Sequence, residues 1–311
     1  MRKSIIFILT LMLMMVSVLS AKSVPMPVNM IPDNARWVLH LDMQQFLTTQ
    51  LSDLLKKNYL EKIDNHIQKL AAEYKFNLLN DTTAITVFGT KKGEKDFVVC
   101  WAGNFNKPHL LSLLEKSPTY EKSDYGKFTI HKWQHAQFGT FVNDHLVMWS
   151  MDETALKNAL DLYTGKTRNK AAAPVVSYMK DIPGDAFLRA AAHNIAALAN
   201  DREASMILKN TGMALFAAIE KNGDLRLTLK MTADTPETAK NIEQIVNGFI
   251  ALARMKQGGE NDPRWKLLDS LKTTLKGNVL QFDFSYPSTE LIAMMEEHRK
   301  SHGKHMHVHE K

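Results

Sequence analysis

Alternating hydrophobic and polar positions predict a first half that begins with a strand, a helix and a hairpin. Residues 36–42 (RWVLHLD) alternate and are rich in strand-forming types, and residues 43–76 then carry apolar side chains at the spacing of a long or broken helix. The strand-like segments 84–89 and 96–102 flank a charged stretch with a glycine, which is typical of a hairpin turn.

The rest of this half is predicted to form a helix, a meander of short strands and a closing helix. Residues 106–116 have helical spacing, and Pro108 falls in the first turn, where its missing N–H is tolerated. Asp152 is a suitable N-cap for a helix at 152–163. The three short strands between these helices are expected at 127–133, 137–142 and 145–150.

The second half of the chain repeats this order. Residues 182–193 (IPGDAFLRAAAH) align without a gap with residues 31–42 (IPDNARWVLHLD), and they share Ile, Pro and Ala at the first, second and fifth positions. Residues 210–234 again read as strand, charged glycine turn and strand, and the strand 277–286 is predicted to correspond to 126–133. An internal duplication is the simplest explanation.

The order β-α-β-β-α-β therefore occurs twice, with the helices of the second copy expected at 236–255 and near 263–274. This order predicts an α+β fold of two related, ferredoxin-like units with helices packed on antiparallel sheets. The predicted parts are a signal peptide at 1–21, a first repeat domain at 22–164, a linker at 165–174, a second repeat domain at 175–297 and a disordered histidine-rich tail at 298–311.

The N-terminal segment has the three parts of a secretory signal peptide. Arg2 and Lys3 precede an apolar run at 5–18, and small residues follow, so cleavage is expected after Ser20 or Ala21. The run is shorter than the roughly 20 residues of a membrane-spanning helix, although an uncleaved signal anchor is the alternative. The mature protein is therefore expected to be secreted or periplasmic, with no transmembrane span.

Charge and cysteine content exclude several classes of function. The formal net charge is +6, but much of it lies at the two ends of the chain, so the body between them is nearly neutral and a nucleic-acid partner is not expected. The single cysteine, Cys100, excludes an intramolecular disulfide and a four-thiolate zinc site. Because Cys100 sits in a strand-like segment, it is predicted to be a buried apolar residue.

No motif of a common enzyme class occurs in the chain. Residues 89–95 superficially resemble a phosphate loop, but a strand follows them, so they are predicted to form a hairpin turn. His131 and His135 are four residues apart on an expected strand and turn, where a structural role is favoured over a metal site. Asp42 and Asp81 lie at strand edges and are predicted to be cap or turn residues.

The segment 31–42 and the helix start Met43-Gln44-Gln45-Phe46 resemble the beginning of a family of uncharacterised bacterial secreted proteins. Members of this family combine a signal peptide with repeated β-α-β-β units and contain a domain of unknown function. The resemblance would cover most of residues 30–297. It implies a fold but no reaction, and no functional residue follows from it.

The histidine-rich C-terminus is the most unusual feature of the sequence. From His298 the chain reads HRKSHGKHMHVHEK, and neutral imidazoles of a flexible chain can coordinate zinc, nickel or copper(II). A solvated, pH-responsive tail is the alternative. The candidate metal ligands are His302, His305, His307 and His309.

Taken together, the sequence predicts a non-catalytic binding or envelope-interaction module without a resident cofactor, whose partner is an unidentified protein or envelope component. Metal binding or buffering through the tail is the first alternative. An extracytoplasmic enzyme of an unrecognised type is the second, and it would need a cleft with catalytic geometry between the two repeats.

Overall fold

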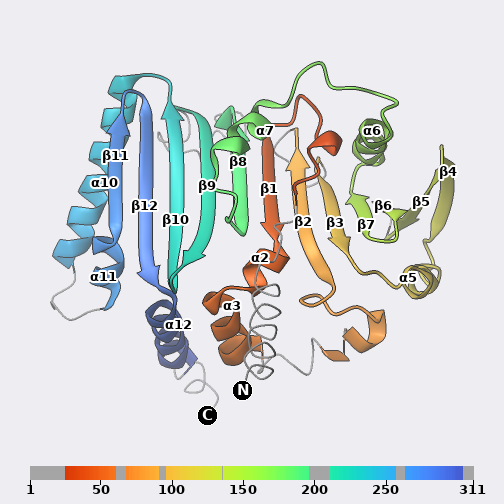
Figure 1. Cartoon of the computed structure of the whole chain (residues 1–311), viewed down its shortest axis with the longest axis horizontal. Helices are drawn as coiled ribbons and strands as arrows, with labels where there is room; N and C mark the ends of the chain where they lie inside the picture. The colour runs from red at the N-terminus through yellow and green to blue at the C-terminus, as the bar shows by residue number, and fades with distance from the viewer. Residues whose placement is uncertain are drawn as a thin grey trace, which may run out of the picture.

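A computed structural model describes residues 25–60, 68–69, 71–90, 96–134, 136–195, 210–256 and 263–303. The strands form one antiparallel sheet in the order β11-β12-β10-β9-β8-β1-β2-β3-β7-β6-β5-β4 (Figure 1). The predicted signal peptide lies outside the described residues. The strands are β1 (Trp37–Asp42), β2 (Thr82–Gly89), β3 (Val98–Gly103), β4 (Glu121–Tyr125), β5 (Phe128–Trp133), β6 (Gln137–Asn143), β7 (Leu146–Ser150), β8 (Leu188–His193), β9 (Thr211–Lys221), β10 (Asp224–Ala233), β11 (Leu271–Lys276) and β12 (Val279–Pro287).

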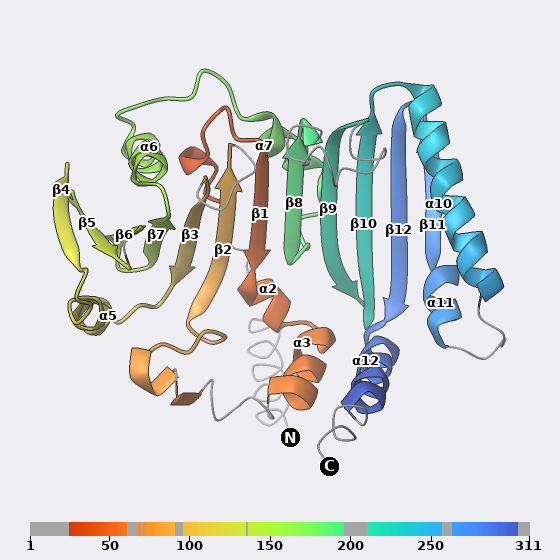
Figure 2. The same cartoon turned by 180° about the vertical axis from the view of Figure 1, so that it is seen from behind.

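Helices lie on both faces of the sheet and beyond the ends of its strands (Figures 1 and 2). Among the described residues, no helix combines the length and the apolar composition that crossing a membrane requires. The helices and helical turns are η1 (Val28–Met30), α2 (Met43–Leu47), α3 (Gln50–Leu55), η2 (Lys56–Leu60), α5 (Lys107–Leu114), α6 (Glu153–Thr164), α7 (Pro174–Tyr178), η3 (Met179–Asp181), α10 (Pro236–Lys256), α11 (Pro263–Asp269) and α12 (Ser288–Gly303).

The two halves of the chain join at the centre of this sheet. Strand β1 pairs with β8, and the register places Leu39 opposite Ala190. From this centre the sheet continues as β2-β3-β7 on one side and as β9-β10-β12 on the other. An antiparallel α+β fold is therefore confirmed. The two halves of the sequence do not form separate sheets but contribute to one.

The ferredoxin-like form of the prediction is not confirmed. In a ferredoxin-like unit the two strands joined through the first helix are parallel and have another strand between them, but here β1 pairs directly and antiparallel with β2, and β8 does so with β9. The predicted match of 277–286 with 126–133 also fails, because β12 pairs with β10 as β7 pairs with β3. The first half contains two additional strands, β4 and β5, so matching the strands of the two halves by their order in the sequence gives the wrong pairs.

The predicted helix at 263–274 and the predicted tail at 298–311 also need correction. Helix α11 ends at Asp269, and strand β11 begins at Leu271. Side-chain burial along β11 alternates with the two-residue period of a strand. Helix α12 extends through Gly303, so the first six residues of the predicted disordered tail, 298–303, are helical. Ile292 anchors this helix in the core, and the helix continues beyond the anchored turns.

The sheet has two faces, which we call face A and face B. On β10, the side chains of Arg226, Thr228 and Lys230 belong to face A, and those of Leu227 and Leu229 belong to face B, because successive strand residues alternate. Residues paired across an antiparallel sheet share a face, so the strand registers extend both faces across the whole sheet.

The two halves bury different faces. In the first half, face A is apolar and packs under α6 and α7, where Leu156, Leu160 and Val175 are fully buried. In the second half, face B packs under α10 through Ala239 and Ile242 (Figure 2). Strands β10 and β12 are uncovered on the opposite side in Figure 1. Face A is thus left open at β10 and β12 (Figure 1), whereas Leu215 and Ala217 on face A of β9 are buried in the main core.

Candidate functional site

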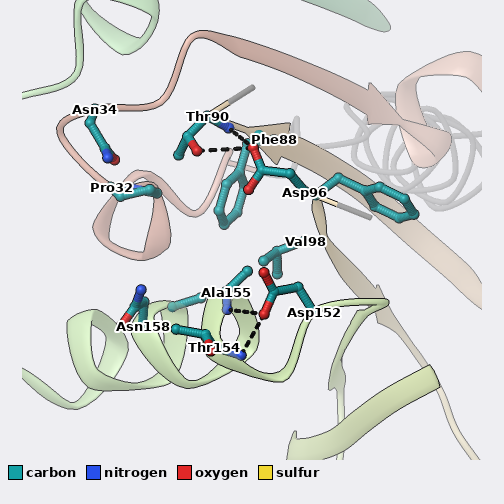
Figure 3. A pocket seen from close by; sticks show the side chains of 13 residues that line it. Pro32, Asn34, Phe88, Thr90, Asp96, Val98, Asp152, Thr154, Ala155 and Asn158 are labelled. Carbon is teal, nitrogen blue, oxygen red and sulfur yellow. Dashed lines mark hydrogen bonds between the residues drawn. The ribbon is translucent and has the colours of Figure 1, made fainter. Parts of the chain in front are cut away.

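A small pocket in the first half lies between the strand ends of β2 and β3 and the start of α6 (Figure 3). Its volume is about 150 Å³, and two carboxylates line it. Asp96 Oδ2 accepts hydrogen bonds from Thr90 N at 3.0 Å and from Thr90 Oγ1 at 2.9 Å. This carboxylate therefore links the residue after β2 to the segment that leads into β3. Residues 91–95 of the predicted hairpin turn lie outside the described residues.

The second carboxylate of this pocket is Asp152, the N-cap of α6. Its Oδ1 accepts hydrogen bonds from Thr154 N at 2.8 Å and from Ala155 N at 3.3 Å, as the sequence predicts for a cap (Figure 3). Both acids thus stabilise local backbone structure, and the pocket lies within the first half instead of between the repeats. This geometry gives no support to an enzyme mechanism based on paired carboxylates.

A larger pocket of about 540 Å³ lies beside the N-terminal lead and the predicted linker. The linker is held in place, because Asn169 Nδ2 donates to Ile31 O at 2.7 Å and Asn169 Oδ1 accepts from Asp33 N at 2.9 Å. Ala173 is 1% exposed and belongs to the main core. The predicted linker therefore packs as part of the fold.

A third pocket, of about 230 Å³, opens on face A of the second half. The turn after η3 forms one side of it, and strands β9, β10 and β12 form the other. Across these strands the register pairs Ala217 with Thr228, and these two small residues lie between the larger pairs Ile219–Arg226 and Leu215–Lys230. The hollow follows from this pattern of side-chain sizes.

Asp283, which pairs with Thr228 in the sheet beside this third pocket, accepts hydrogen bonds through both carboxylate oxygens. Asp283 Oδ1 accepts from Thr228 Oγ1 at 2.8 Å, and Asp283 Oδ2 accepts from Gln281 Nε2 at 2.7 Å. Arg226 Nε is buried and has no hydrogen-bond partner. Within the described part of the chain, neither Arg226 nor Lys230 forms an ion pair.

The structure places the four predicted metal ligands only in part. His302 lies in the backbone of α12, whereas His305, His307 and His309 lie outside the described residues. Within the described ranges, no three His, Cys, Asp or Glu side chains are grouped closely enough to hold a metal ion. Zinc, nickel or copper binding by the tail stays a prediction.

The remaining candidate residues from the sequence take part in packing, capping or turn hydrogen bonds. Cys100 is 2% exposed, and burial raises the pKa of its thiol to about 12, so it is a buried apolar residue as predicted. His131 Nδ1 lies 2.8 Å from Tyr120 Oη, and His135 is outside the described residues. Asp42 caps α2, and Asp81 Oδ2 accepts from Asn77 N at 2.6 Å, which confirms their predicted cap and turn roles.

Sequence reasoning missed the polar residues of the third pocket. The segment RLTLK at 226–230 alternates strictly, so it could have placed Arg226, Thr228 and Lys230 on one face of a strand. Gln281 and Asp283 alternate in the same way on β12. The neighbour of each strand was unknown, however, and only the register brings these residues together.

Comparisons with known proteins give no family assignment. No family model matches the chain, and no curated protein matches it. The chain is similar to a solved structure of TP0453, crystal form III, with 13% identity and a TM-score of 0.49, over 88% of this chain and 99% of that one. Crystal forms I and IV of TP0453 give 12% and 13% identity and TM-scores of 0.46 and 0.49, covering 89% and 87% of this chain and 98% and 96% of theirs.

Proposed function

We propose that this chain is a non-catalytic binding protein that recognises its partner with face A of strands β10, β11 and β12. The observation that supports this most is the open surface there, whose polar side chains surround a pocket of about 230 Å³. An ordinary solvated sheet face would be polar but needs neither a hollow nor cations without partners. Recognition sites combine a concave surface with a few convergent polar groups.

The proposed site of action is outside the cytoplasm, either secreted or in the periplasm. The predicted signal peptide supports this localisation. The partner is proposed to be a protein or another component of the cell envelope. Because the body of the chain is nearly neutral, a partner would be recognised by local groups of the surface more than by long-range attraction.

We also propose that the two halves descend from one duplicated unit. In the gapless sequence alignment of 31–42 with 182–193, Leu39 matches Ala190. The same two residues lie opposite each other in the β1–β8 register. A twofold axis perpendicular to the sheet through that pair would relate the two strands, which supports duplication from two independent observations.

Site-directed crosslinking tests the proposed binding surface. The matched variants are Thr274→Cys on the edge strand β11 and Ser123→Cys on the opposite edge strand β4, since both positions are exposed. The native Cys100 is buried with a raised pKa of about 12, so a thiol-directed photocrosslinker will label the introduced cysteine. The labelled proteins are added to envelope fractions of the producing cell.

The expected result is a discrete crosslinked species with Thr274→Cys that is absent with Ser123→Cys and that excess unlabelled protein suppresses. The same yield and pattern from both positions would contradict recognition through face A of strands β10, β11 and β12. Retention of the native far-ultraviolet circular dichroism in both variants establishes that the comparison concerns folded protein.

A second proposal, metal binding by the C-terminus, gains one supporting observation. Positions 298 and 302 fall one turn apart in the backbone of α12, and residues four apart on a helix are neighbours. Titration calorimetry with zinc, nickel and copper(II) should therefore detect binding by the mature chain that is lost when the chain ends at Glu297. Equal binding by the two proteins would contradict a role for the tail.

A further inference from the structure

We infer that Arg226 and Lys230 form a subsite for a small organic diacid, with one carboxylate at each cation and the hydrocarbon part against the apolar wall of the same pocket. This inference rests on the proposed function, because it names the chemistry that face A recognises. The carboxylate is the anion we assign, and phosphate or sulfate without a hydrocarbon part serves as the comparison.

The positions of the two cations come from the strand itself. Arg226 and Lys230 are four residues apart on β10 and line the same pocket, so their Cα atoms are separated by roughly 13 Å. Both side chains are long enough to approach a ligand lying between them. Thr228, midway between them, is small and leaves the centre of the pocket open.

The surrounding charges favour an anion. Arg226 Nε is withdrawn from solvent without an acceptor, which costs free energy that a bound carboxylate would recover. Asp283, beside Thr228, already accepts hydrogen bonds through both oxygens. Asp181 also lines the pocket and opposes anion binding, but the two cations outnumber it.

The apolar wall distinguishes an organic acid from a bare inorganic anion. Leu215, Ala217 and Ile219 lie beside Lys230, Thr228 and Arg226 in the register of β9 with β10. Ile182 and Pro183, from the turn after η3, line the pocket as well. Leu215, Ala217 and Ile182 are already buried, so the exposed part of this wall comes from Ile219 and Pro183. A hydrocarbon segment held between the two cations can cover that part, and its burial adds to affinity in proportion to the apolar area removed from water.

Titration calorimetry with defined probes tests the subsite. The mature protein is titrated with glutarate, butyrate and inorganic sulfate at equal ionic strength. Glutarate is expected to bind most tightly, because it offers two carboxylates and a hydrocarbon middle. Sulfate is expected to bind at least about tenfold more weakly than glutarate, because it covers none of the apolar wall. Equal affinity for sulfate and glutarate would overturn the assignment of an organic acid.

Variants locate the binding. Arg226→Gln and Lys230→Gln should each weaken glutarate binding at least about tenfold, since each removes a charge-assisted contact. Lys272→Gln, an exposed residue of face A outside the pocket, is the matched control and should change the affinity less than about twofold. Arg226→Lys keeps the charge and should retain part of the binding. Unchanged glutarate binding in Arg226→Gln and Lys230→Gln would overturn the subsite.

Failure of this inference is distinguishable from failure of the proposed function. Crosslinking at Thr274 without glutarate binding would retain face A as the recognition surface and overturn the subsite. Glutarate binding that Arg226→Gln abolishes, without crosslinking, would support the subsite and contradict a macromolecular partner on this face. Thermal unfolding of each variant, measured without ligand, separates loss of binding from loss of fold.

Discussion

Glu220 is a single side chain that ties together parts of both halves of the molecule. From the end of β9, its Oε1 accepts from Gln50 N at 2.5 Å, and its Oε2 accepts from Leu51 N at 2.8 Å and from Ser288 Oγ at 2.7 Å. Two of these donors open α3 in the first half, and the third opens α12 in the second. The carboxylate of this strand residue thus caps the starts of two helices.

Replacing this carboxylate should therefore weaken the whole fold. Glu220→Gln places an amide NH₂ group against N–H donors and is expected to lower the free energy of unfolding by about 1 to 3 kcal/mol. Urea denaturation followed by circular dichroism measures the change. Glu297→Gln, at an exposed position of α12, is the control and should stay within about 0.5 kcal/mol of the parent. Equal stabilities of the two variants would contradict the capping role.

His131 makes stability depend on pH. Burial, followed by the charges of Lys107 and Lys122, lowers its pKa below the usual 6.5, and Glu115 opposes the shift. As the pH falls below 6.5, the unfolded chain binds a proton at this position before the folded chain does. The stability that His131 contributes is thus present above 6.5 and is lost as the pH falls through the lowered pKa.

A His131→Gln variant should consequently lose less stability than the parent between about pH 7 and about pH 5. Urea denaturation across that range gives the two slopes, and NMR titration of the parent should place the His131 pKa below 6.5. His145→Gln, at an exposed turn, is the control. A His131 that titrates above 6.5 would refute the argument.

At the scale of elements, the β9–β10 hairpin depends on its turn glycine. Gly223 has a φ of +82°, and the preceding Asn222 has a φ of 55°, which are the left-handed values that a tight hairpin turn requires. The sequence predicts this turn from a charged stretch with a glycine between two strand-like segments. A side chain at Gly223 would be strained whatever space surrounds it.

Two glycine substitutions should therefore have opposite effects. Gly223→Ala is expected to lower the free energy of unfolding by about 1 to 2 kcal/mol because the turn keeps its left-handed backbone. Gly248→Ala, in the exposed middle of α10 with open space at its Cβ position, should raise it by about 0.5 to 1 kcal/mol. Thermal unfolding of both variants measures the signs, and a stabilising Gly223→Ala would refute the backbone argument.

The elements that the sequence missed share a physical cause. Strand β4 (EKSDY) was not predicted because nearly all of it is exposed and charged, so it carries no apolar alternation. Such a composition suits an edge strand, where charge discourages pairing with other chains. At the opposite edge, Leu271 and Leu275 of β11 match either a helix or a strand in a short window.

At the scale of the whole molecule, the shared sheet predicts that the halves unfold together. The β1–β8 pairing joins them through the centre of the sheet, and separating them would leave both strands as open edges. Amide exchange in β2 and β10 should therefore report similar opening free energies. Separate fragments 25–173 and 174–303 should each fail to show the cooperative unfolding of the full chain. A fragment that unfolds cooperatively on its own would contradict this coupling.

The sequence by itself determined most of the local structure, because periodicity, caps and turn residues act over a few neighbouring positions. It placed the Asp152 cap, the turn between β9 and β10 and the buried Cys100. Only the tertiary structure decided that the two halves share one sheet and that Arg226 and Lys230 lie beside Ile219 and Leu215 in the lining of one pocket. Strand neighbours and registers join residues far apart in the chain, and alternation within one strand carries no information about its neighbour.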